Sequence, residues 1–200
     1  MSNAQHLSAT GEWYTNPTAL VPVLETFQGQ IDLDPFSSAK ANTIVKAVLF
    51  WTSIDFPLLR SWYGRVFVNP PGTCEIVNGV YIGCNRSVKT ETGGTRKCTC
   101  GLPKRILQKC VTQSAIGTEI VYLAYSVNQL RHLSNIKIPA GLQLTIAIPP
   151  KRIAYLDSET LKPVAGTPCD SAFICMSKNA NTHTRFDKAF EATGALCYSR

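Results

Sequence analysis

The order of apolar and polar positions predicts strands and helices that alternate along most of the chain. Short apolar runs at 31–35, 65–69, 119–125, 144–150, 172–177 and 195–199 are typical of buried strands. Asn16 and Pro17 can begin a helix that ends at Gly29, and helical spacing recurs at 106–116, 128–133 and 185–193. The segment 41–50 is compatible with a helix or a strand. This alternation predicts an α/β fold around a mostly parallel sheet.

Two of the predicted strands end in residues that are unusual for a simple turn. The stretch "IDLDPFSS" carries Asp32 and Asp34 before a proline, and "RVFVNPPG" ends in Asn69 followed by two prolines. Because prolines lack a backbone donor and fix φ, the second strand must stop there and present the Asn69 amide on a rigid support. Ligands of α/β proteins bind at the carboxyl ends of the strands. The sequence therefore predicts a ligand site formed by these two ends.

Composition narrows the class of protein. With 200 residues, 44% hydrophobic and 16% charged, the chain is expected to form one domain, 1–200. The glycine patterns that cradle phosphates are absent, which disfavours nucleoside triphosphates and dinucleotides. We find neither a membrane-length apolar run nor a secretory signal, so we expect a cytoplasmic protein without a membrane partner. The net charge of +7 favours an anionic partner such as nucleic acid, or else reflects a solvated basic surface.

Several segments, taken in order, resemble the DNA N6-adenine methyltransferases, most closely their small phage-type group. "EWYTNP", from Glu12 to Pro17, is similar to the element that packs under the methyl donor, and "IDLDPFSS" resembles the acidic loop that holds S-adenosylmethionine. "VFVNPPG" resembles the catalytic (N/D)PP(Y/F) loop, and "IDF" at 54–56 is a looser match to a pair that touches the donor's adenine. The resemblance covers nearly the whole chain except about 74–103. It implies a Rossmann-like methyltransferase fold that uses S-adenosylmethionine. It also implies that the protein acts in a bacterial or phage-infected cell.

The resemblance also implies a mechanism and a set of residues. An adenine flipped out of double-stranded DNA would donate its amino N–H groups to Asn69 and Pro70, which hold the nitrogen in line with the donor's methyl group. The implied catalytic residues are Asn69, Pro70, Pro71 and Gly72. The implied cofactor-binding residues are Trp13, Tyr14, Thr15, Asp32, Asp34, Pro35, Ser37, Asp55 and Phe56.

One departure from the family pattern concerns the target base. The family commonly has Tyr or Phe after the second proline, where the ring stacks on the flipped base, and this chain has Gly72. Stacking would then come from another aromatic residue, for which Trp62, Tyr81 and Tyr125 are the candidates.

A basic, cysteine-rich insertion follows the predicted catalytic loop, at about 74–110. It holds five of the eight cysteines. A polar hairpin with so little apolar content needs a cross-link to be stable, and a structural Zn²⁺ bound by cysteines would supply one. The candidate ligands are Cys84, Cys98, Cys100 and Cys110, although free thiols on a hairpin turning at Gly93-Gly94 are the alternative. The candidate DNA-binding residues are Arg86, Lys89, Arg96, Lys97, Lys104 and Arg105.

Other interpretations remain open on the sequence alone. The same loop type serves RNA bases and protein glutamines, and a chain that keeps the fold without turnover would be a non-catalytic DNA-binding module. Trp13 and Tyr14 are also compatible with ordinary core packing, and Asp55 with a solvated loop carboxylate.

Overall fold

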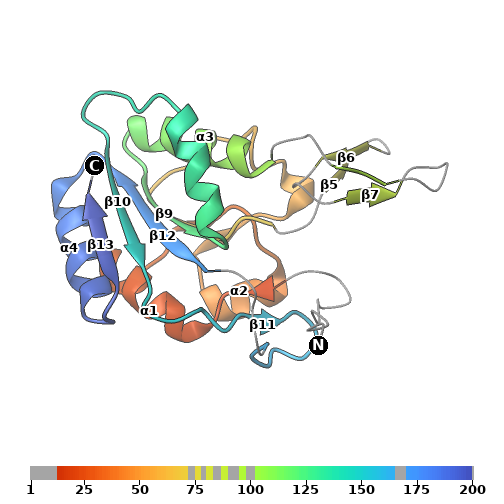
Figure 1. Ribbon diagram of the computed structural model, residues 1–200, viewed down its shortest axis with the longest axis horizontal. Helices are drawn as coiled ribbons and strands as arrows, with labels where there is room; N and C mark the ends of the chain where they lie inside the picture. Colours follow the sequence, from red (N-terminus) through yellow and green to blue (C-terminus); the bar gives the residue numbers. More distant parts are fainter. Residues whose placement is uncertain are drawn as a thin grey trace.

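A seven-stranded sheet in the order β13-β10-β12-β9-β4-β2-β3 forms the centre of the computed structural model (Figure 1). The structure describes residues 13–71, 102–164 and 170–199, and the backbone of four short strands between 75 and 97. The strands of the sheet are β2 (Leu33–Asp34), β3 (Leu49–Phe50), β4 (Arg65–Val68), β9 (Glu119–Ala124), β10 (Gln143–Ile148), β12 (Ala172–Ser177) and β13 (Leu196–Ser199).

Four α-helices and two 3₁₀ segments accompany the sheet within the described ranges. They are α1 (Pro17–Thr26), α2 (Ala39–Val45), η1 (Ser53–Asp55), α3 (Leu102–Ala115), η2 (Val127–Asn135) and α4 (Ala180–Glu191). The Asn16 side chain accepts from Thr18 N and caps α1, with Pro17 in the first position as predicted. The ambiguous segment 41–50 contains both the end of α2 and strand β3, separated by Lys46 in a left-handed conformation.

The sheet is mixed, which corrects the expectation of a mostly parallel one. The neighbours β3, β2, β4 and β9 pair in parallel, whereas β9–β12, β12–β10 and β10–β13 pair antiparallel. No helix separates β10 from β12 along the described chain, so the second strand returns beside the first in the opposite direction. The α/β class is confirmed, with a parallel half and an antiparallel half.

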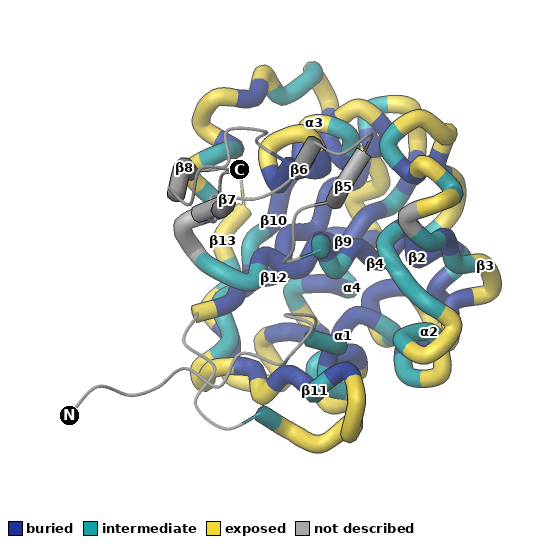
Figure 2. Tube along the Cα trace, turned by 90° about the vertical axis from the view of Figure 1, so that its right-hand side faces the viewer, coloured by how far each residue is buried: buried dark blue, intermediate teal, exposed yellow. Residues whose placement is uncertain are grey.

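Helices cover both faces of the sheet. On one face, α3 buries Ile106, Leu107 and Val111 against alternate residues of β4, β9 and β12. On the other face, α1 and α4 bury residues such as Val23 and Phe190 against the intervening positions of the same strands. Figure 2 shows the resulting gradient, with buried central strands and exposed backbone at the β3 and β13 edges. Burial on both faces explains why the central strands read as continuous apolar runs.

Four smaller pairings lie outside the main sheet. β1 (Trp13–Tyr14) pairs antiparallel with β11 (Leu156–Asp157), and Leu156 bridges to Pro163. β5 (Glu75–Val77) pairs with β6 (Val80–Ile82), and β7 (Ser87–Lys89) pairs with β8 (Thr95–Lys97). The antiparallel β7–β8 pair agrees with the predicted hairpin, whose Gly93-Gly94 turn lies outside the described residues.

An ion pair sets the register of the two neighbouring strands β2 and β4 at their amino ends. Asp32 N donates to Arg65 O over 2.8 Å, and Arg65 N returns a bond to Asp32 Oδ2 over 2.8 Å. The guanidinium adds two bonds, Nε to Oδ2 at 2.9 Å and Nη2 to Oδ1 at 3.0 Å. The Arg65 guanidinium holds the pKa of Asp32 down at about 2, so this carboxylate is charged at neutral pH.

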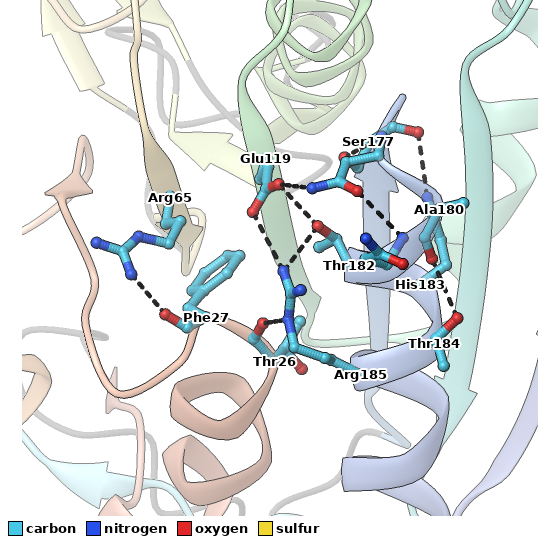
Figure 3. Close-up of polar contacts among 12 residues, drawn as sticks. Thr26, Phe27, Arg65, Glu119, Ser177, Ala180, Thr182, His183, Thr184 and Arg185 are labelled. Atoms are coloured by element: carbon cyan, nitrogen blue, oxygen red, sulfur yellow. Dashed lines mark hydrogen bonds and ion pairs between the residues drawn. The ribbon is translucent and has the colours of Figure 1, made fainter.

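A second polar cluster fastens the helices to the same amino edge of the sheet (Figure 3). Glu119, the first residue of β9, accepts from Asn179 Nδ2 at 2.8 Å and Thr182 Oγ1 at 2.7 Å, and lies 3.8 Å from Arg185 Nη2. Arg185 Nε donates to Thr26 O at the end of α1, and Arg65 Nη1 donates to Phe27 O. The polar groups of this edge are therefore paired with one another.

The contribution of the Asp32–Arg65 pair to stability can be tested by substituting Gly64. Its φ is +69°, and an added Cβ would lie 2.5 Å from Asp32 Oδ2. Gly141 is the matched control, with φ of +76° and nothing within 4 Å of an added Cβ. We expect Gly141→Ala to cost about 1–2 kcal/mol of unfolding free energy from backbone conformation alone. Gly64→Ala should cost at least about 1 kcal/mol more because the carboxylate must leave Arg65. Equal losses in urea denaturation would contradict this role.

Candidate functional site

The parallel half of the sheet contains a switch in chain direction between β2 and β4. From β2 the chain moves outward to β3, whereas from β4 it moves the opposite way to β9. Ligands of open α/β sheets bind in the crevice at the carboxyl ends of strands at such a switch point. Asp34 ends β2 and Asn69 directly follows β4, so both predicted motifs lie at this place.

Asp34 is a buried carboxyl group at the end of β2. The residue is 2% exposed, and its Oδ1 accepts from Phe36 N at 3.2 Å. Burial raises the pKa of Asp34 to about 7, against the hydrogen bonds from Phe36 and Ser37, which lower it. A carboxyl with this pKa at a strand end is a candidate for binding a ligand that carries amines or hydroxyls.

The predicted N-terminal element lies on the same edge. Tyr14 Oη is 3.4 Å from Ser38 Oγ, and Ser38 in turn caps α2 by accepting from Ala41 N. Thr15 is only 2% exposed, yet its Oγ1 and the buried Nε1 of Trp13 have no hydrogen-bond partner within the described structure. The Trp13 ring stacks on Tyr155 with centroids 5.9 Å apart. Both atoms are thus buried without a partner among the described residues, on either side of Tyr14, and a polar ligand is one group that would complete their hydrogen bonding.

The Asn69 loop is positioned as the sequence predicts. Val68 is buried at the end of β4, Asn69 is half-buried and Pro70 is buried. Within the described ranges, no hydrogen bond engages the Asn69 amide, which directly follows β4. Gly72 lies outside the described residues.

The segment after β3 reaches the same edge and carries the predicted Asp-Phe pair. Asp55 Oδ2 accepts from Thr52 N at 2.8 Å and Thr52 Oγ1 at 3.0 Å, and these bonds lower its pKa. The carboxylate therefore braces its own loop. Phe56 has φ of +52° and is 58% exposed, a conformation that bulky residues rarely adopt and that presents the ring to solvent.

Two residues from the predicted set lie elsewhere. Asp32 is at the amino end of β2, where Arg65 and Gln30 occupy its carboxylate, so the structure gives it a role in strand register and not a place in the candidate site. Trp62 precedes β4 and is buried, with its Nε1 bonded to Pro57 O, which removes it as a stacking residue for a base. Tyr125, by contrast, is half-buried directly after β9, and the Tyr81 side chain lies outside the described structure.

The structure adds a buried pair that sequence reasoning missed. Tyr122 Oη donates to Gln129 Oε1 over 3.2 Å, and Gln129 Nε2 is buried without a partner in the described structure. Gln129 belongs to the predicted short helix near 128–133, where a single glutamine carries no signal of its own.

The basic and metal predictions fall largely outside the described side chains. Lys104 and Arg105 are exposed on the first turn of α3, whereas nothing is described of the side chains of Arg86, Lys89, Arg96 and Lys97. Because α3 ends shortly before β9 begins at the amino edge, its first turn lies toward the carboxyl edge.

Cys110 is the described member of the predicted zinc set, and its surroundings do not fit a metal ligand. It is fully buried in the core under α3, and this burial raises the pKa of its thiol. Cys84, Cys98 and Cys100 lie outside the described residues. Among the residues that the structure does describe, no group of three or more His, Cys, Asp or Glu could hold a metal ion.

Comparison with known proteins gives no relative for this chain. No protein-family model, no curated protein and no solved structure matches it. In the described ranges, none of the helices has the length and apolar content needed to cross a membrane.

The raised pKa of Asp34 predicts a pH-dependent stability. The folded protein holds the proton up to about pH 7, whereas the ordinary carboxyl pKa is 3.8, so stabilisation present at low pH is lost as pH rises between these values. The neutral variant Asp34→Asn lacks this titration. The unfolding free energy of the variant minus that of wild type should therefore be about 1 kcal/mol or more higher at pH 8 than at pH 4. Asp55→Asn is the control, since a lowered pKa gives the opposite sign. A flat difference for Asp34→Asn in urea denaturation would contradict the assignment.

Proposed function

We propose that this protein is an S-adenosylmethionine-dependent methyltransferase acting on the exocyclic N6 of adenine in DNA. The observation that carries the proposal is that two strands end at one switch point of the sheet. One ends in the buried carboxyl group of Asp34, and the other is followed by the Asn-Pro-Pro sequence, whose Asn69 amide has no hydrogen bond among the described residues. The mixed α/β sheet is compatible with a Rossmann-like fold. The ordered likeness of the 12–17, 31–38 and 66–72 segments to the phage-type N6-adenine methyltransferases supplies the reaction type.

The residues on the donor side fit this ligand. S-adenosylmethionine, when bound, supplies an electrophilic methyl group on a sulfonium, together with an ammonium and ribose hydroxyls. Asp34 can accept from such donors, and a nearby positive charge would return its pKa toward the ordinary range. Thr15 Oγ1 and Trp13 Nε1 are buried and unpaired, so a polar ligand would satisfy them. The exposed Phe56 ring offers an apolar face for a heterocycle.

The acceptor side explains the Asn-Pro-Pro sequence. An adenine amino group is a poor nucleophile because its lone pair is delocalised into the ring. Asn69 Oδ1 and the Pro70 carbonyl can each accept one N–H, which holds the nitrogen and directs its lone pair toward the methyl carbon. The two prolines keep this loop ordered before the base arrives, which lowers the entropy cost of binding. Tyr125, half-buried directly after β9, would be the candidate to stack on the base.

DNA is the acceptor that the charge of the chain favours. The net charge is +7, and the exposed Lys104 and Arg105 stand on the turn of α3 toward the carboxyl edge. Phosphate contacts of this type orient a duplex without reading its sequence. A flipped base can then enter the site from a duplex held at that edge.

Two single variants separate acceptor chemistry from donor binding. Asn69→Ala should reduce methyl transfer to DNA by roughly 100-fold or more, because one of the two acceptors for the amine is lost. Its affinity for S-adenosylmethionine in calorimetry should stay within about twofold, since the change lies on the acceptor side. Asp34→Ala should instead weaken donor binding by about tenfold or more.

Asn135→Ala, which removes an exposed amide on η2, is the matched control and should change neither quantity. Full transfer activity in Asn69→Ala would contradict the proposed chemistry.

The basic turn of α3 is tested by salt dependence. The double variant Lys104→Ala/Arg105→Ala should weaken DNA binding equally for all sequences and reduce the slope of log affinity against log salt by about 1–2. The exposed lysines of the α4 region, Lys178 and Lys188, give a double alanine control with the same loss of charge. Equal effects from both double variants, measured by fluorescence anisotropy, would show that only net charge matters and would contradict a local contact.

A further inference from the structure

The Tyr122–Gln129 pair is a buried polar unit whose hydrogen bonding is incomplete. Both residues are almost fully buried, Gln129 being 5% exposed, and Tyr122 Oη donates to Gln129 Oε1 over 3.2 Å. The two N–H groups of Gln129 Nε2 have no partner in the described structure. Leaving an amide donor unpaired in the interior is unfavourable, so we expect such a group to bind a ligand or an ordered water.

The hydroxyl of Tyr122 fixes the orientation of the amide. Full burial raises the pKa of Tyr122 well above its ordinary value, so the phenol is protonated, and its hydroxyl donates to Gln129 Oε1. The amide oxygen of Gln129 is therefore turned toward Tyr122, and the amide nitrogen is turned away from it. The free hydrogen-bonding capacity of Gln129 therefore lies mainly in the two N–H donors of Nε2, with one lone pair left on Oε1.

The fold places this pair beside the acceptor loop. Tyr122 is the register partner of Val68, the residue that precedes Asn69. β4 and β9 run in parallel and end at the same edge, and η2 begins three residues after β9 ends. Gln129 N also donates to Ser126 O, which ties the first turn of η2 to the end of β9. The unpaired amide is therefore held near the strand end that carries the Asn-Pro-Pro sequence.

We propose that Gln129 is a specificity-determining residue that donates a hydrogen bond from Nε2 to ring nitrogen N1 of the target adenine, and that Tyr122 is the positioning residue that orients it. The inference rests on the proposed function, because it names how the same site recognises its base. With both amino N–H groups accepted by Asn69 and Pro70, N1 is the remaining Watson–Crick acceptor of adenine. Guanine presents an N–H at this position, so two donors would face each other and guanine would be rejected.

Base analogues test the contact atom by atom. The methylated sequence is first mapped on plasmid DNA, and duplexes are then made with adenine, 1-deazaadenine or 7-deazaadenine at the target position. We expect wild-type kcat/KM to fall about tenfold or more with 1-deazaadenine, relative to the 7-deazaadenine duplex, because the buried donor loses its acceptor. Gln129→Met, an apolar residue of similar length, should lose most of this preference, and the ratio between the two proteins cancels the analogues' intrinsic reactivities.

Tyr122→Phe supplies a second variant in which Gln129 is kept. It should retain methyl transfer and lose part of the discrimination against 1-deazaadenine, since the amide is no longer oriented; a purely structural role for Tyr122 would leave the ratio unchanged. Wild-type discrimination retained in Gln129→Met, or absent in the wild type, would overturn the inference and assign Nε2 to an internal water. Absence of transfer to any adenine duplex would overturn the proposed function and this inference with it.

Discussion

The Asp32–Arg65 ion pair joins the two strands whose ends carry the candidate site residues Asp34 and Asn69. Asp32 N donates to Arg65 O, Arg65 N donates to the Asp32 carboxylate, and a bidentate contact from the guanidinium joins β2 to β4 at their amino ends. Because both strands run in parallel toward the same edge, Asp34 and Asn69 both lie at the carboxyl edge, at the switch point of the sheet. Gly64 is part of this arrangement, since a side chain there would displace the carboxylate. A contact at the amino ends of the two strands thus supports the arrangement of the candidate site at their carboxyl ends.

The two edges of the sheet differ in how their polar groups are satisfied. At the amino edge, Glu119 is paired with residues of α4, and Arg185 and Arg65 reach carbonyls at the end of α1. The carboxyl edge holds the buried carboxyl group of Asp34, and Gln129 Nε2, in the segment that follows β9, is buried without a partner among the described residues. Asp187 Oδ1 on α4 is a further unpaired buried atom, apart from this edge. The first edge stabilises the fold, and the second has the incomplete hydrogen bonding that ligand sites show in the absence of ligand.

Local chemistry made much of the fold predictable. The cap at Asn16, the stop at Pro70 and the apolar runs of the central strands depend on nearby residues, and each lies where the sequence indicates. The first part of α4 was missed because residues 180–184 are mostly polar, so the apolar period begins only at Phe186. Strand direction was mispredicted for the antiparallel half because it depends on long-range pairing between β9, β10, β12 and β13.

The candidate site was predictable to the extent that its residues follow strands. Asp34 and Asn69 met this condition, and Asp32 was misassigned because two carboxylates two residues apart look alike in sequence, although one begins the strand and the other ends it. Tyr122 and Gln129 are recognisable only from a contact between the sheet and η2. Cys110 was a candidate ligand because five cysteines gather between 74 and 110, but on α3 it lies in the core.

The most direct test of the account is to identify the methylated product. The protein is incubated with S-adenosylmethionine and unmethylated DNA, with matched RNA and protein samples in parallel, and the DNA is digested to nucleosides for mass spectrometry. The account predicts N6-methyl-2′-deoxyadenosine from DNA with the wild-type protein and none with Asn69→Ala. A methyl group found on cytosine, on RNA or on protein, or no methylated product from a protein that binds S-adenosylmethionine, would contradict it.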